Sequence, residues 1–348
     1  MRYILLPQNK SKSYLLSLDL VSSLNHGKRM ETLIHNYHLN PSTSTFAITT
    51  KIHCLSDFRL KQLLPIKQVQ VRNCNRSKRI ETKMVAGDAI SSHPEQNPGT
   101  RQQKIVIRNN HGEKLVGLLH ETGSTDIVIL CHGFQSTKES NTIVNLASAL
   151  EKEGISVFRF DFAGNGESEG SFQYGNYRRE ADDLHSVIQY FHGNNRVTCA
   201  ILGHSKGGNV VLLYASKYHD VSHVINVSGR YKTEGGVEER LGKGYLQKVK
   251  ENGFIDVESK TGEVLYRVTE ESLMDRLNTN MHEACLQIDK DCKVLTVHGS
   301  DDSIVRVEEA LEFAKVIPNH KLHIIEGANH GFSKHQDELI SIVLSFIK

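Results

Sequence analysis

The segment 200–208, Ala-Ile-Leu-Gly-His-Ser-Lys-Gly-Gly, constrains the fold of this chain more than any other. A short apolar run ends there in a Gly-x-Ser-x-Gly pattern, and an apolar run of helical character, 209–214, follows at once. This order predicts a strand, a sharp turn and a helix, with the Ser205 hydroxyl projecting from the edge of a sheet. Gly203 and Gly207 flank the serine because a Cβ at either position would crowd so tight a turn. Ordinary glycine-rich turns also match this pattern, so the interpretation of Ser205 as a nucleophile depends on the rest of the chain.

Apolar runs and helical patterns alternate from residue 104 to the end of the chain. An antiparallel hairpin is expected first, because two apolar segments flank the turn Asn-Asn-His-Gly at 109–112. The later runs are continuously apolar, as in strands that are covered on both faces. Together these patterns predict an α/β fold with a mostly parallel, eight-stranded sheet flanked by helices. The expected segments are strands at 104–107, 115–120, 126–131, 155–160, 197–202, 224–227, 294–297 and 322–325, and helices at 143–150, 179–191 and 339–347.

One interval interrupts the alternation. About 60 residues separate Gly229 from Lys290, where roughly 15 to 25 would suffice for a crossover connection. This insertion, at about 230–290, follows the sixth strand, and ligands bind at the carboxyl ends of strands in such sheets. We therefore expect it to form a cap over the site.

Charge divides the chain into two parts. Residues 1–83 carry 14 Lys and Arg against 4 Asp and Glu, whereas the remainder carries 28 against 36. The first part, without sustained periodicity, is interpreted as a basic, disordered extension, and its composition resembles an organellar transit peptide. The alternatives are a plain basic tail, or upstream sequence outside a working protein that starts at Met84. The predicted organisation is an extension at 1–83, a linker at 84–103 and one α/β domain at 104–348.

Several classes of protein are disfavoured by composition. The first residues have too short an apolar core for a secretory signal, and no run is long enough to cross a bilayer. The basic extension lacks aromatic residues between its charges, so no nucleic-acid partner is expected. The six cysteines are scattered, which favours reduced thiols and an intracellular protein. The expected compartment is the cytoplasm, or a chloroplast or other organelle if 1–83 is a transit peptide.

Candidates for a catalytic base and its orienting carboxylate follow two later strands. His330 lies in a glycine-rich loop after the strand at 322–325, and Asp302 follows the strand at 294–297. Asp301 is the alternative carboxylate, and either could instead cap the helix that starts near Val307. The order Ser205, acid, His330 is the order expected with a Gly-x-Ser-x-Gly turn. Ester or amide hydrolysis by serine needs these three groups.

The reaction also needs donors for an oxyanion. The expected donors are the backbone N–H of Lys206, directly after Ser205, and that of Phe134, in the loop after the strand at 126–131. His132 begins this loop and precedes the serine, so a structural role is expected for it.

With these motifs in place, the chain resembles the α/β-hydrolase superfamily from about residue 104 to residue 348. Within it, the chain looks most similar to the serine aminopeptidase and monoacylglycerol-lipase-like group, and especially to the cinnamoyl (feruloyl) esterases with a cap after the sixth strand. The resemblance implies a Ser205, Asp302 and His330 triad. Lys206 departs from the family, and we expect its cation to tune the serine or to favour anionic substrates. The segments that carry the resemblance are 132–134, 161–168, 203–208, 298–302 and 329–332.

The sequence thus predicts a serine carboxylesterase that needs no metal or cofactor and acts on a small-molecule ester. The segment 230–290 holds 10 basic and 12 acidic residues, unlike the apolar lid of a lipase that works at an oil surface. A soluble, medium-sized ester is therefore expected, with an aromatic ester as one candidate. Its aromatic residues, Tyr231, Tyr245, Phe254 and Tyr266, are expected either to hold the substrate or to form the core of the cap. The alternatives are a thioesterase, a peptidase or a carbon–carbon hydrolase on the same triad, or a weakly catalytic ligand receptor; the oligomeric state is not predicted.

Overall fold

The computed structural model describes residues 35–38, 47–50 and 102–348. The chain divides into two compact units, Met1–Ala89 and Ile90–Lys348. In the first unit, strands β1 (His35–His38) and β2 (Ala47–Thr50) pair antiparallel, within the part of the chain that the sequence indicates to be a basic, disordered extension. The β-branched residues of β2 favour a strand although the segment is too short for a visible periodicity. The rest of the predicted extension, its interpretation as a transit peptide, and the predicted linker up to residue 101 lie outside the described residues.

An eight-stranded sheet organises the second unit, in the order β12-β11-β8-β7-β5-β6-β4-β3. Strand β4 pairs antiparallel with β3 and β6, and all other neighbouring strands of this sheet pair parallel, so the prediction of a mostly parallel, eight-stranded sheet is confirmed. The first strand begins at Gln102 rather than at the predicted residue 104. The strands are β3 (Gln102–Arg108), β4 (Lys114–His120), β5 (Asp126–Cys131), β6 (Ser156–Phe160), β7 (Val197–His204), β8 (His223–Val227), β11 (Lys293–Gly299) and β12 (His320–Ile325).

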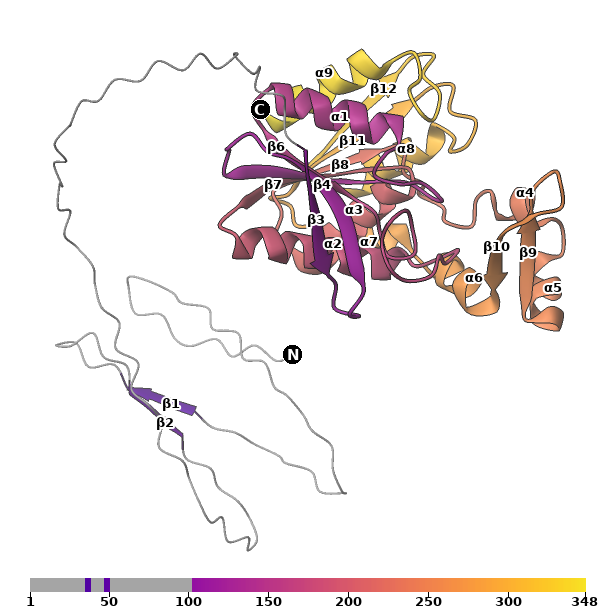
Figure 1. Ribbon diagram of the computed structural model, residues 1–348, viewed down its shortest axis with the longest axis horizontal. Coiled ribbons are helices and arrows are strands. Elements are labelled where there is room, and N and C mark those ends of the chain that lie inside the picture. The colour runs from indigo at the N-terminus through magenta and orange to yellow at the C-terminus, as the bar shows by residue number, and fades with distance from the viewer. Residues whose placement is uncertain (1–34, 39–46, 51–101) are drawn as a thin grey trace, which may run out of the picture. The chain divides into compact units, whose positions relative to one another are not determined.

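Helices cover both faces of this sheet (Figure 1). Helices α1 (Asn141–Lys152) and α9 (Gln336–Ile347) cover one face and enclose one apolar core. The other core lies under α2, α3, α7 and α8. Strands β5 and β6 are buried on both faces, which explains why they read as continuous apolar runs. The helices of the second face are α2 (Tyr177–Gly193), α3 (Lys206–Tyr218), α7 (Met281–Leu286) and α8 (Glu308–Val316).

The segment between β8 and β11 is an insertion with elements of its own, and β8 is the sixth strand of the sheet. A two-stranded hairpin lies at its centre, and α6 starts from a capping box in which the Thr269 hydroxyl accepts a hydrogen bond from the Ser272 N–H. Figure 1 shows these elements gathered beside the sheet, with α7 back against it. The sequence predicted the insertion but not its elements: α4 (Val237–Leu241), α5 (Tyr245–Asn252), β9 (Phe254–Glu258), β10 (Val264–Thr269) and α6 (Glu270–Leu277).

A third apolar cluster belongs mainly to this insertion. Val237, Leu241, Val249, Val268 and Leu273 form it together with Tyr266 and with Tyr174 from the segment before α2. Side chains of the sheet domain, Phe134 and Phe172, pack against its edge. The insertion therefore contacts the loop that follows β5.

Free thiols occupy the four cysteine positions of the described residues. Cys131, Cys285 and Cys292 are buried, and burial raises the pKa of Cys285 to about 12 and that of Cys292 to about 11. These thiols thus pack as small apolar groups. No helix of the part of the chain that the structure describes has the length and apolarity of a membrane span.

Candidate active site

Ser205 lies in a strained turn between β7 and α3. The strand ends at His204 and the helix begins at Lys206, so Ser205 alone makes the turn, with φ 57° and ψ −121°. Its N–H donates to the Val227 carbonyl at 2.7 Å, which fixes the backbone against the next strand. Non-glycine residues rarely adopt such angles, and they persist where the surroundings impose them at functional sites. The turn presents the Ser205 side chain at the carboxyl edge of the sheet.

The two glycines around Ser205 are required by packing. A Cβ at Gly203 would lie 2.0 Å from the Gly207 carbonyl oxygen. A Cβ at Gly207 would lie 2.5 Å from the carbonyl oxygens of Cys131 and His132. Both contacts are far shorter than any real carbon–oxygen contact between non-bonded atoms. The Gly-x-Ser-x-Gly pattern therefore reflects close approach of β7, α3 and the end of β5.

Asp302 and His330 meet at the same edge of the sheet, in the loops after β11 and β12. His330 Nδ1–H donates to Asp302 Oδ2 at 2.7 Å, while Asp302 Oδ1 accepts from the N–H groups of Ile304 and Val305 at 2.9 and 2.8 Å. Burial raises the pKa of the Asp302 carboxyl, but hydrogen bonds from two histidines outweigh it and hold this pKa well below its usual range. Asp302 is thus an ionised, buried acceptor, whereas the alternative candidate Asp301 is exposed.

Two further histidines surround this pair, and the sequence analysis did not single them out. His298, in β11, donates from Nε2 to the Val305 carbonyl at 2.8 Å and lies 3.3 Å from Asp302 Oδ2. His204 donates from Nε2 to the His330 carbonyl at 2.8 Å, which joins the residue before Ser205 to the histidine loop. Burial lowers the pKa of His204 to about 4, so the ring is neutral near pH 7. Among residues 102–348 no hydrogen bond joins the Ser205 hydroxyl itself to His330, and such bonds are often long without substrate.

The loop after β5 passes directly against Ser205. A Cβ at Gly133 would lie 3.0 Å from Ser205 Cβ and 3.5 Å from its Oγ. The next residue is Phe134, and neither its N–H nor that of Lys206 donates to another group of the described residues. Lys206 lies in the first turn of α3, where N–H groups attract negative charge.

His132 begins this loop as a buried structural residue. Its Nε2 accepts from the Phe162 N–H at 3.1 Å, so the proton lies on Nδ1, which donates to the Gly133 carbonyl at 2.8 Å. Burial lowers the pKa of His132 to about 4, in keeping with a neutral ring. The geometry agrees with the structural role that the sequence analysis expected for this histidine.

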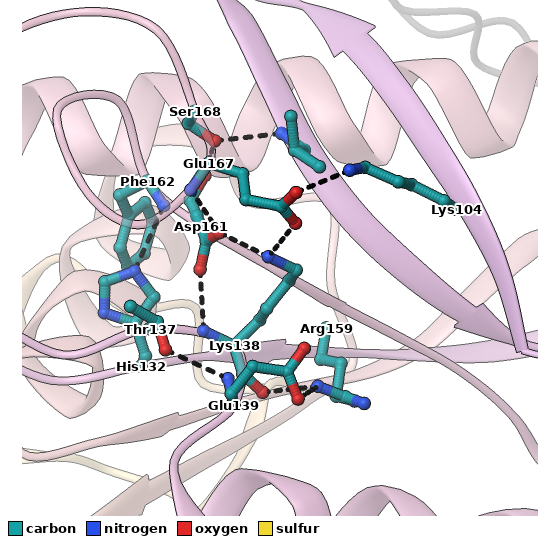
Figure 2. A network of polar contacts seen from close by, with 11 residues as sticks. Lys104, His132, Thr137, Lys138, Glu139, Arg159, Asp161, Phe162, Glu167 and Ser168 are labelled. Carbon is teal, nitrogen blue, oxygen red and sulfur yellow. Dashed lines mark hydrogen bonds and ion pairs between the residues drawn. The ribbon is translucent and has the colours of Figure 1, made fainter.

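The far end of the loop is held by a buried ion pair (Figure 2). The Lys138 ammonium, 3% exposed, contacts Asp161 Oδ2 at 2.6 Å and Glu167 Oε2 at 2.8 Å. The Lys138 N–H donates to Asp161 Oδ1 at 2.7 Å, and Arg159 donates to the Lys138 carbonyl at 2.7 Å. In the sequence, the segment 161–168 stood out only as one of those that carry the family resemblance. The structure shows that this turn and the loop after β5 are clasped together.

The Lys206 side chain differs from the expectation that its cation would act on Ser205 or on a substrate. Its ammonium is buried and contacts Glu180 Oε1 of α2 at 2.6 Å, 5.0 Å above the Tyr177 ring. Burial raises the pKa of Glu180 to about 7, although Lys206 opposes the rise. The side chain of Lys206 thus ties α3 to α2, and only its backbone remains available beside Ser205.

The aromatic residues of the insertion divide into two groups. Tyr266 contacts Phe134, with ring centroids 5.7 Å apart. Tyr231 instead packs on Phe313 in the core under the sheet. Phe254 lies under the Arg267 guanidinium, and Tyr245 packs in the core of the insertion. Of the two roles expected for these residues, the core of the insertion accounts for Tyr245 and for most of Tyr266, while Tyr266 also contacts Phe134. Phe172 and Tyr174 join it around Phe134 at 5.3 and 5.6 Å.

A cavity of about 550 Å³ opens beside this aromatic group, between residues 135–137, the turn at 164–166 and β10. Ser205 and His330 do not line it. We therefore assign the cavity no part in the chemistry.

The sheet order, the strained serine after a central strand and the paired acid and histidine after two later strands define an α/β hydrolase. The chain belongs to the serine aminopeptidase S33 family, whose model matches residues 123–337. The predicted fold and family resemblance are thereby confirmed, and the protein is a member of a hydrolase family. The roles of the individual residues stay predictions.

The individual proteins reported next are each less than 30% identical to this chain over the aligned residues. The uncharacterized Saccharomyces cerevisiae protein YDL057W is 27% identical over 229 residues, with 59% of this chain and 68% of that protein covered. Protein phosphatase methylesterase 1 of Candida albicans is 28% identical over 111 residues, 32% of this chain and 30% of the relative. The solved structure of Est1E from Butyrivibrio proteoclasticus with ferulic acid bound superposes with a TM-score of 0.61 at 24% identity, covering 70% of this chain and 97% of that chain. The last similarity establishes the fold.

Proposed function

We propose that this protein is a serine carboxylesterase with Ser205 as nucleophile, His330 as general base and Asp302 as the carboxylate that orients His330. The observation that carries the proposal is the strained backbone of Ser205, held at the sheet edge where the Asp302–His330 pair also lies. Backbone strain of this kind costs energy and is kept where function uses it. An ionised, buried Asp302 fixes the tautomer of His330 with its proton on Nδ1, which leaves Nε2 free to accept a proton.

The proposed reaction has two halves. Ser205 Oγ attacks the ester carbonyl carbon while His330 Nε2 takes the hydroxyl proton, and the N–H groups of Phe134 and Lys206 hold the negative oxygen. The bond to the alcohol oxygen breaks, His330 protonates the leaving alcohol, and the acyl group remains on Ser205. Water then attacks the acyl carbon, His330 takes a proton from it and returns one to Ser205, and the carboxylic acid leaves.

An ester is favoured over a peptide by the charges near Phe134. An aminopeptidase must hold the ammonium group of its substrate, which requires a carboxylate or another acceptor. The charged group that lies over the Phe134 ring is the guanidinium of Arg240, 4.5 Å from its centroid. The methylesterase among the relatives, which acts on an ester by its name, further supports this choice.

A soluble, medium-sized and aromatic ester fits the surroundings of the two proposed oxyanion donors. Phe134 is ringed by Phe172, Tyr174 and Tyr266, whose edges favour the face of another aromatic group. Ferulic acid, bound by Est1E, is an aromatic acid, and that fold similarity supports the same class here. The insertion, with its many charges, is proposed to act as the cap that encloses such a substrate.

Hydrolysis of p-nitrophenyl esters, from acetate to long acyl chains, tests this function with the full chain and its Ser205→Ala variant. We expect turnover that Ser205→Ala abolishes while the variant keeps the same melting temperature. Activity that survives in Ser205→Ala would exclude Ser205 as the nucleophile. Absence of turnover in the folded protein, together with a ligand that raises its melting temperature, would favour a receptor instead.

A further inference from the structure

Two arginines of the insertion lie next to the proposed oxyanion loop. The Arg240 guanidinium, from α4, lies 4.5 Å from the centre of the Phe134 ring. The Arg276 guanidinium, from α6, lies 4.9 Å from the centre of the Tyr174 ring, which is itself 5.6 Å from Phe134. The two cations therefore flank one group of aromatic rings, and Phe134 carries the backbone N–H proposed to hold the oxyanion.

Neither of these guanidinium groups forms an ion pair with a described residue. Arg276 is only 6% exposed, and it donates from Nε to the Thr233 carbonyl at 2.9 Å and from Nη2 to the Gly235 carbonyl at 3.2 Å. Neutral carbonyls satisfy these hydrogens but do not neutralise the charge. A buried cation such as Arg276 is costly without a counter-charge, so it calls for an anion, whereas Arg240 is exposed and adds a second positive charge beside it.

The nearby carboxyl groups are engaged elsewhere. Asp275 Oδ2 accepts from the Asn176 N–H at 2.5 Å, and Glu180 pairs with Lys206. The third arginine of this region, Arg230, has Glu309 at 3.6 Å. No carboxylate of the described residues therefore forms an ion pair with Arg240 or Arg276.

A buried hydroxyl completes the group. Tyr174 is fully buried, and its hydroxyl has no hydrogen-bond partner among the described residues. Its ring stacks beside that of Tyr266, with centroids 6.3 Å apart and planes 13° apart. Burial raises the pKa of Tyr174, so the hydroxyl keeps its proton and remains a donor. Buried polar groups nearly always have a partner, and a donor beside two cations lacks an acceptor.

We infer that Arg240, Arg276 and Tyr174 form a subsite for an anionic group of the substrate, a carboxylate or a phosphate, beside the scissile ester. The inference rests on the proposed esterase function and names its substrate class: an ester that carries a second, ionised acid group. Guanidinium and phenol hydrogens together match the acceptor oxygens of such a group. This cation set, rather than Lys206, gives the site its preference for anions.

Two substrates with the same scissile bond test the subsite in the full chain. Monophenyl adipate carries a free carboxylate, and its methyl ester has the same length without the charge. We expect the ratio of their kcat/KM values to favour the half ester about tenfold to a hundredfold, as for hydrogen bonds to a charged group. Hydrolysis of phenyl acetate, measured alongside, reports on the esterase itself, so a ratio near one with phenyl acetate still cleaved would overturn a carboxylate subsite without contradicting the esterase function.

Three variants locate the preference. Arg240→Gln and Tyr174→Phe should each lower the ratio, whereas Lys260→Gln, which removes one exposed positive charge from the same insertion, should leave it unchanged. Tyr174→Phe removes a hydroxyl without a partner, so its melting temperature should be equal or higher, which separates binding from folding. A ratio unchanged in both Arg240→Gln and Tyr174→Phe would overturn the assignment.

Inorganic phosphate distinguishes the two acid groups. Three results together would show that the subsite takes a phosphate. Phosphate would inhibit phenyl acetate hydrolysis, Arg240→Gln would weaken that inhibition, and the half ester would not be preferred. If the half ester is preferred, the subsite takes a carboxylate. Neither effect in an enzyme that cleaves phenyl acetate would contradict the inference.

Discussion

Asp301 and Asp302 are neighbours in sequence with very different surroundings. One is exposed, and the other is 6% exposed and accepts hydrogen bonds from two backbone N–H groups and His330. The sequence could place an acid in this loop from its position after a strand. It could not decide between the two residues, because the choice depends on how the loop turns toward β12.

Asp302→Asn tests the assignment at this position. An amide cannot stabilise the cation that forms on His330 and disturbs its tautomer, so kcat for p-nitrophenyl acetate should fall roughly 10³- to 10⁴-fold. Asp301→Asn is the matched control, and its kcat should equal that of the native protein. Equal losses in both variants would exclude a specific role for Asp302.

His204 offers a second prediction, on pH and stability. Its pKa is lowered by burial from the ordinary 6.5 to about 4, so between these values the unfolded chain binds a proton that the folded chain does not. The stability that a neutral His204 provides is therefore complete above pH 6.5 and lost as the pH falls toward 4. His204→Gln keeps a donor for the His330 carbonyl without this titration. Relative to pH 7.5, the native protein should lose about 2 kcal/mol more unfolding free energy at pH 5 than the variant, in urea titrations. The same loss in both proteins would contradict the prediction.

At the scale of the elements, two loops from adjacent strands are clasped by side chains that no local pattern reveals. Lys138 follows β5 and Asp161 follows β6, and they meet although 23 positions separate them (Figure 2). The sequence predicted both strands from local composition. The pairing depends on the parallel register of β5 and β6, which brings their carboxyl ends together, so it became visible only in three dimensions.

Lys138→Met tests this clasp. The change leaves the Asp161 carboxylate, which has no exposed surface, without its counter-ion, so the free energy of unfolding should fall by about 3–5 kcal/mol. Because the loop carries Phe134, kcat per folded molecule should also fall. Lys104→Met removes the exposed partner of Glu167 in the same network and should barely move the urea midpoint. If both variants have the same midpoint, the clasp does not stabilise the loop.

At the scale of the whole second unit, the apolar residues form two cores on the faces of the sheet and a third in the insertion. Continuous apolar runs and chain order were enough to predict the sheet, the position of the insertion and the edge at which the site residues meet. The interior of the insertion had no such signal, since its helices are short, from five to eight residues, and its strands are half-buried.

Because the insertion has an apolar core of its own, we expect it to open locally at a lower free energy than the sheet. Amide hydrogens of β9 and β10 should exchange by opening of the insertion alone, at a lower free energy than those of β5 and β7, which need global unfolding. Hydrogen exchange followed by mass spectrometry measures both in one sample. Equal protection in the two pairs of strands would show that the insertion and the sheet unfold as one cooperative unit.

The contact between Gly133 and Ser205 has a consequence for how this protein tolerates change. Loop positions usually accept many residues, but a single methyl group at position 133 would press on the serine at 3.0 Å and on the His204 carbonyl oxygen at 3.2 Å. In a saturation library scored separately for abundance and for turnover, most replacements at this position should therefore accumulate in the cell at the native level. Few of them should retain hydrolytic turnover. The lack of space for a Cβ at Gly133 thus limits which substitutions near Ser205 are available for the evolution of new substrate specificity.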